Sequence, residues 1–480
     1  MKKKTGRLNK LKKTSLSCGL VTVAALTPSV HADQTTATVA ATGQPAATTA
    51  PALSPAWQKP AWLTDLSAGA KEGYDDNVLL VSGLGLPTQN SWISSASAKV
   101  GLDFAPLMSG QDFFKTLTFV YAPDVNIYYD APQENNSGQR IGDSIKASAG
   151  NFSLTLDNGF LYNIGSHEAP IYALSQAPGG NTDDRFRNFY AQAVPRERRD
   201  QIQDRGAIAL QEDLNNDFFV RAAASTMYYN LHTILRATVA PYIGYQNWPD
   251  RYDANGGLDG GYRLTKNFAF TVGYRYGHQY QMQFPEDVSP ADRHFSSNDY
   301  QRALLGLEGN PWSWLNVKFA AGPDFRYYNS MAPVNDRHAI YPFVEGSATA
   351  TLTQNQTLTF STKDWEWVAS TGLVPYYDMA YILNYHWNAT RHWGFDVNGK
   401  ILNANFSSGN DSAGSEPSKR NDIQYTAGFG VTYTFTQNLN ANLMYCHNIG
   451  RNLDELPPTL APAYRNFAQD LVSLGVQYKF

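Results

Sequence analysis

The last nine residues of the chain constrain its fold more than any other feature. In this segment every second residue is apolar, and the residues between them are small or polar: Val472, Leu474, Val476, Tyr478 and Phe480 against Ser473, Gly475, Gln477 and Lys479. Successive side chains of a β-strand point to opposite faces, so the segment predicts one apolar face and one polar face. A strand in a membrane-spanning barrel has this pattern, with lipid outside and a polar interior.

The same alternation recurs along the chain, at residues 268–276, 377–387, 395–401 and 424–435. A shift of one residue would turn each polar row toward lipid, so the register of these strands is firmly specified. We therefore predict an all-β fold, a transmembrane antiparallel β-barrel over residues 61–480. It should have about 18 strands, with 16 as the alternative.

Turn residues divide this region into strands. We expect them at 62–75, 91–104, 112–122, 140–148, 151–163, 200–213, 216–230, 251–265, 267–281, 298–309, 313–327, 340–353, 356–368, 375–388, 392–405, 421–436, 438–449 and 467–480. Short connections, such as Leu214–Asn215, Asn310–Pro311 and Gln437, alternate with long ones, such as 164–199. The even count, which depends on a turn at Ala149–Gly150, puts both ends of the barrel on the short-turn side.

Two features fit this pattern poorly. Pro123 cannot donate to a ladder, so we expect it at a strand end or a bulge. The apolar row also changes phase between Phe360 and Trp365. A bulge or an aromatic girdle at the membrane interface would explain that change.

The N-terminus has the pattern of a secretory signal peptide, residues 1–32. Seven Lys and Arg residues precede a short apolar stretch at 16–28 and a small-x-small end at Val30-His31-Ala32. Without those seven, the 38 Lys and Arg of the chain fall to 31, against 42 Asp and Glu. This acidic balance argues against nucleic acid as a partner. Residues 33–60 are rich in Ala, Thr and Pro, which predicts a flexible periplasmic lead-in.

Aromatic residues make up 13% of the chain. Tyr and Trp favour membrane–water interfaces, but a soluble β-sandwich or a carbohydrate-binding protein would also use aromatic strands. Cys18 lies at the beginning of the apolar stretch, not after it, so we do not expect lipidation. Cys446 would be the only mature cysteine, which excludes an internal disulfide.

The aromatic ending, with Phe480, Tyr478 and Val476 in one row, resembles the terminal assembly signal of bacterial outer-membrane barrels. Together with Glu72–Val78 and Arg196–Arg205, it resembles a group of outer-membrane β-barrel porins, some linked to exopolysaccharide production. The resemblance implies the barrel fold, an outer-membrane location in a Gram-negative bacterium, and recognition by the barrel-assembly machinery. It implies no catalytic residues.

Enzyme motifs for hydrolysis, phosphate binding or metal binding do not occur, so we expect no enzyme and no cofactor. The segment Asp253-Ala-Asn-Gly-Gly257 has part of a calcium-loop spacing but lacks the distal Glu. Asp, Asn and Gly are also ordinary turn residues, and we favour that interpretation.

Candidate pore-lining residues fall into two groups. The first is the Arg cluster of the long connection 164–199, which would narrow the pore if the loop enters the lumen and would bind lipid phosphates if it stays outside: Arg185, Arg187, Arg196, Arg198 and Arg199. The second is a set of charges on expected inward faces, which would tune ion selectivity or only be solvated: Arg275, Lys318, Asp324, Arg326, Glu345, Asp396 and Lys400.

The function predicted from these features is passive diffusion of small hydrophilic solutes through an outer-membrane pore. The alternatives are polysaccharide export, an enzyme on a barrel, and a non-conducting structural or adhesive barrel. The expected partners are outer-membrane lipid, the assembly machinery, the solute or polysaccharide, and a second copy of the chain if the pore is oligomeric.

Overall fold

The computed structural model describes residues 59–78, 88–108, 113–166, 199–233, 251–281, 297–329, 337–368, 375–406, 420–452 and 466–480. The predicted signal peptide and the lead-in up to residue 58 lie outside these ranges. In the described part of the chain no helix is long and apolar enough to cross a membrane.

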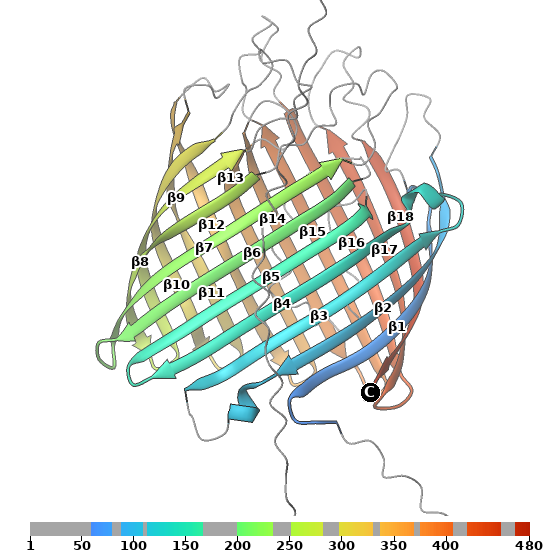
Figure 1. Cartoon of the computed structure of the whole chain (residues 1–480), viewed down its shortest axis with the longest axis horizontal. Helices are drawn as coiled ribbons and strands as arrows, with labels where there is room; N and C mark the ends of the chain where they lie inside the picture. The colour runs from blue at the N-terminus through green and yellow to red at the C-terminus, as the bar shows by residue number, and fades with distance from the viewer. Residues whose placement is uncertain are drawn as a thin grey trace, which may run out of the picture. The chain divides into compact units, whose positions relative to one another are not determined.

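Eighteen strands form within these ranges (Figure 1). They are β1 (Leu63–Asp75), β2 (Ser91–Asp103), β3 (Phe114–Tyr128), β4 (Asn136–Ala149), β5 (Phe152–Ser166), β6 (Arg199–Asp213), β7 (Phe218–Thr233), β8 (Arg251–Thr265), β9 (Phe268–Gln281), β10 (Asn298–Trp312), β11 (Leu315–Tyr328), β12 (His338–Thr353), β13 (Gln356–Trp367), β14 (Tyr376–Asn388), β15 (Trp393–Phe406), β16 (Arg420–Thr434), β17 (Leu439–Asn452) and β18 (Phe467–Lys479). Two short 3₁₀ helices, Ala105–Met108 and Pro132–Glu134, lie in connections.

Each strand pairs antiparallel with its neighbours in sequence, and β1 pairs with β18 from Ser67↔Lys479 to Asp75↔Leu471. This last ladder closes the sheet into a barrel, which leaves no free sheet edge at β1 or β18. The predicted fold class and strand number are therefore confirmed.

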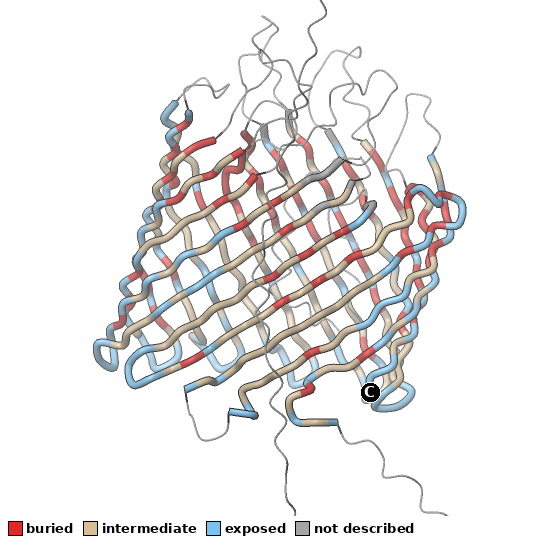
Figure 2. Tube along the Cα trace, viewed as in Figure 1, coloured by how far each residue is buried: buried red, intermediate tan, exposed pale blue. Residues whose placement is uncertain are grey.

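The alternation that predicted the strands separates the two faces of the wall. On β18, Val472, Leu474 and Val476 are exposed, whereas Leu471 and Ser473 are buried. Figure 2 shows this change from exposed to buried along the strands. The apolar row therefore faces outward, and the small and polar row faces the lumen.

The short turns lie at the rim that holds the C-terminus (Figure 1). Aromatic pairs lie at both rims: Trp312 and Trp314 stack at 5.7 Å at the turn rim, and Tyr74 and Trp92 meet at 5.4 Å at the opposite rim. The turn at Ala149–Gly150 is confirmed, with Gly150 at a φ of 59° between β4 and β5.

Two local predictions are wrong. The connection expected at Asn310–Pro311 lies at Ser313–Trp314, because β10 continues to Trp312 through a register shift that begins at Gly309, which has a φ of 107°. Pro123 lies inside β3, opposite Gln139, and not at a strand end. The ladder to β2 has no pairs between Ser97↔Asp124 and Val100↔Tyr121, so the missing N–H falls where that ladder is interrupted.

Candidate functional site

The ladder between β12 and β13 ends before either strand does. Its last pair toward the loop rim is Val344↔Asp364, although β12 continues along β11 to Tyr327↔His338. In the same direction β13 continues along β14 to Trp367↔Tyr376. Beyond Asp364, β13 therefore runs with β14 but separates from β12.

The end of β13 lies instead against the inner faces of strands on the far side of β12. Arg326 of β11 donates to the carbonyl of Glu366 at 3.0 Å, and Gln279 of β9 donates to the same carbonyl at 3.1 Å. Arg251 of β8 donates to the carbonyl of Val368 at 3.2 Å. Because these donors lie two, four and five strands from β13, the end of β13 must cross into the lumen. We call residues 365–368 and 376–378 the inward tip.

Aromatic side chains pack the inward tip against the wall. Trp365 and Trp367 stack at 4.3 Å, and Trp367 meets Tyr229 of β7 edge-on at 6.1 Å. The guanidinium of Arg251 lies 5.2 Å from the ring centres of both Tyr229 and Trp367, and Arg251 also donates to the hydroxyl of Tyr376 at 3.3 Å. Such desolvated cation–π contacts are worth about 2 kcal/mol each.

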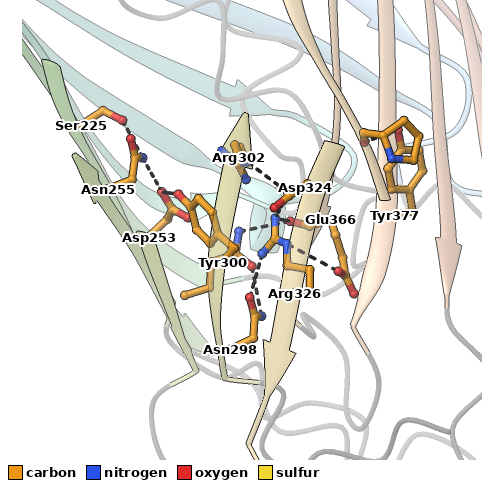
Figure 3. Close-up of polar contacts among 12 residues, drawn as sticks. Ser225, Asp253, Asn255, Asn298, Tyr300, Arg302, Asp324, Arg326, Glu366 and Tyr377 are labelled. Carbon is orange, nitrogen blue, oxygen red and sulfur yellow. Dashed lines mark hydrogen bonds and ion pairs between the residues drawn. The ribbon is translucent and has the colours of Figure 1, made fainter. Parts of the chain in front are cut away.

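A buried ionic network supports the other side of the tip (Figure 3). Arg326 bonds Asp324 at 2.6 Å and Asn298 at 2.8 Å, and its Nε lies 3.7 Å from a carboxylate oxygen of Glu366. Tyr328 also donates to Glu366. Since removing one member of such a buried pair typically costs about 3–5 kcal/mol, the network fixes the tip to β11.

The predicted site did not include the tip, although the sequence carried a signal for it. The phase change between Phe360 and Trp365 is real, but the bulge explanation is wrong, because both ladders of β13 keep a constant register there. Phe360 is exposed on the outer face, whereas Trp365 and Trp367 lie on the opposite face and are buried. The aromatic row changes face where the strand leaves the wall.

On the turn side of the tip, the lumen holds a cavity of ≈ 630 Å³. The predicted residues that line it are Arg275, Lys318, Glu345, Asp396 and Lys400. Asp324 and Arg326 also come from inward rows, but they are fully buried in the network under the tip.

The remaining predicted residues are the arginines of the connection 164–199 and the C-terminal residues. Arg185, Arg187, Arg196 and Arg198 lie outside the described residues, and Arg199 is the first residue of β6. Val476 and Tyr478 belong to the exposed row of β18, and the Phe480 amide donates to Leu66 at 2.8 Å.

Ion pairs narrow the lumen further. Arg205 of β6 reaches Glu345 of β12 at 3.4 Å, although five strands, β7 to β11, lie between the two along the wall. Arg221 of β7 bonds Glu308 of β10 at 3.0 Å and Asp259 of β8 at 3.0 Å. These side chains extend into the cavity and reduce the width available to a solute.

The segment Asp253–Gly257 is part of β8 and not a turn or a calcium loop. Asp253 accepts hydrogen bonds from Tyr300 at 3.0 Å and from Asn255 at 3.0 Å. The described residues contain no group of three or more His, Cys, Asp and Glu side chains arranged to hold a metal ion.

Comparison with known proteins gives similarity only to solved structures. No family model matches the chain, and no curated protein matches it. The FrpB iron transporter from Neisseria meningitidis is 10% identical, with a TM-score of 0.39, over 87% of this chain and 82% of that one. Pseudomonas aeruginosa OccK2, solved with glucuronate, is 10% identical, with a TM-score of 0.38, over 87% and 98%. Acinetobacter baumannii OccAB3 is 10% identical, with a TM-score of 0.36, over 87% and 99%.

Proposed function

We propose that this protein is a bacterial outer-membrane channel that lets small hydrophilic solutes diffuse through a constricted lumen. The observation that carries the proposal is the combination of a closed barrel, an apolar outer row and a charged internal cavity. The strands are 12 to 16 residues long, which exceeds the roughly 9–11 residues that a tilted strand needs to cross a bilayer.

Side chains inside the lumen favour passage of small solutes only. A barrel of this strand number normally encloses water. Here the inward tip covers part of the loop side of the lumen, and the Arg205–Glu345 and Arg221–Glu308 pairs extend into the cavity below it. We infer that selection depends on solute size and on the charges of the lining, with no coupling to an energy source.

Polysaccharide export is the second function consistent with the exopolysaccharide-linked porin group. Sugar rings would need exposed aromatic faces along the route. The aromatic rings of the inward tip are instead packed against the wall, with Trp367 and Tyr376 each 1% exposed. This packing favours a diffusion channel over a sugar track.

Single-channel recording of the refolded full-length chain in a planar bilayer tests the proposal. A folded barrel, recognised by a gel mobility that changes on heating, should give steady conductance steps. The reversal potential in a salt gradient then gives the ion preference. Folded protein that never conducts would exclude diffusion and favour a plugged exporter or a structural barrel.

A further inference from the structure

Several cations surround one carboxylate in the cavity under the inward tip. Glu345 of β12 lies 3.4 Å from the guanidinium of Arg205 and 3.8 Å from the ammonium of Lys363, its direct partner on β13. Lys318 of β11 is two residues out of register with Glu345, because Ala320 is opposite Glu345 and Lys318 is opposite Ser347. Such diagonal neighbours lie about 7–8 Å apart, within reach of a lysine side chain.

One cation of this group lacks a direct acidic partner among the described residues. Lys318 is exposed, lines the cavity and forms no ion pair with the described residues. Asp324 is already paired with Arg302 and Arg326. Glu345 pairs with both Arg205 and Lys363, and Lys318 lies beside them.

A fourth cation at the edge of the cavity has an unused donor. Arg302 lines the cavity, is only 4% exposed, and lies between the rings of Tyr300 and Phe343 at 4.0 and 4.1 Å. Its Nε bonds Asp324 at 3.0 Å, but its buried Nη2 has no hydrogen-bond partner within the part of the chain that the structure describes. Buried donors are almost always paired in folded proteins, so this nitrogen has the capacity to donate to one further acceptor.

We infer that this group is a binding subsite for the carboxylate of a small organic anion, an inference that rests on the proposed channel function. Glu345 holds the position of that carboxylate when no solute is present. Its side chain is 38% exposed, so an entering carboxylate can reach the cations that Glu345 now shares. The solute then binds Lys318 and Lys363 from the lumen and moves on when Glu345 takes its place again.

The test measures how acetate reduces the chloride current through the refolded full-length channel at constant ionic strength. In Lys318→Met the half-inhibiting acetate concentration should rise about threefold to fivefold, the effect of losing one exposed ion pair. Lys146→Met is the matched control, because Lys146 is also exposed on an inward row, opposite Thr155 on β5, and its strand β4 is seven strands from β11 along the wall. It should change that concentration less than about twofold.

A second variant should lower the half-inhibiting acetate concentration instead of raising it. Glu345→Gln removes the competing carboxylate, so acetate should bind at least about twofold more tightly. A purely structural role for Glu345 would not produce tighter binding. Equal effects of the two lysine variants would overturn the subsite in favour of general lumen charge, and weaker binding in Glu345→Gln would also overturn it.

A silent channel would refute the proposed function without deciding this inference, so a second measurement does not depend on conductance. The ammonium of Lys363 lies 4.1 Å from the ring of Trp365. Acetate titrated into the detergent-solubilised protein should change tryptophan fluorescence, and Trp365→Phe and Lys318→Met should reduce that change. A signal that neither substitution alters would overturn the subsite.

Discussion

The guanidinium of Arg326 on β11 donates to the backbone carbonyl of Glu366 on β13 at 3.0 Å. In an uninterrupted barrel that carbonyl would bond a neighbouring strand, and β11 is not a neighbour of β13. Side chains of the wall therefore take the place of the missing backbone ladder between β13 and β12. These side-chain bonds hold the inward tip toward β11, whereas its backbone ladder runs through β14 to β15, where Tyr376 is opposite Phe406.

Arg251→Gln should release the tip. The substitution removes the bond to the Val368 carbonyl, the bond to the Tyr376 hydroxyl, and the contacts with Tyr229 and Trp367. A charged hydrogen bond contributes about 1.5–3 kcal/mol, so the population with a displaced tip should rise about tenfold or more. Single-channel recording should show more frequent high-conductance openings.

Arg263→Gln is the control for that variant. Arg263 lies on the same strand, β8, but bonds Asp213 and the carbonyls of the turn at Asn215 and Asn216. It lies at the opposite rim from the tip, so its loss should leave the openings unchanged. The same opening frequency in both variants would show that the tip does not control the current.

Features that depend on residues close in sequence could be predicted, and features that depend on residues far apart in sequence could not. Strand β8 was expected at 251–265 and is observed at Arg251–Thr265, because a strand shows itself by the alternation of neighbouring residues. The inward tip was not predicted, since Arg251 and Val368 are 117 residues apart. Local periodicity marks where the aromatic row of β13 changes face, but it does not identify the strands that receive it.

Leu474→Arg tests which face of the wall meets lipid. Leu474 is 58% exposed and lies near the middle of β18, so the substitution should place a charge in the hydrocarbon layer. The free energy of unfolding in lipid vesicles should fall by about 2–4 kcal/mol. Gln477→Arg, on the inward row of the same strand, should cost less than about 1 kcal/mol. The reverse order of the two costs would contradict the assignment of the faces.

Gly277→Ala tests the packing beneath the buried network. A Cβ at Gly277 would lie 2.2 Å from Cζ of Tyr300, which is fully buried and supports Arg302 and Arg326. Tyr300 must move, so we expect a loss of about 1–3 kcal/mol in urea unfolding. Gly260→Ala is the control, because a Cβ there meets no atom within 4 Å. It should be neutral or stabilise by up to about 1 kcal/mol. Equal stability of the two variants would show that Tyr300 is not held against Gly277.

The β1–β18 ladder can be tested by cross-linking in a Cys446→Ala background. Ala70 is opposite Val476 in this ladder, and both residues belong to outward rows. Opposite residues in an antiparallel pair have Cα atoms about 4.5–5.5 Å apart, which suits a disulfide. Ala70→Cys with Val476→Cys should therefore cross-link on oxidation of the folded protein, and the heated product should migrate differently from the reduced chain.

Ala70→Cys with Leu474→Cys keeps the same face but is two residues out of register, because Leu474 is opposite Glu72. It should cross-link poorly, since its Cα atoms are separated by about 7–8 Å. Efficient cross-linking of this second pair alone would mean that the barrel closes in a different register.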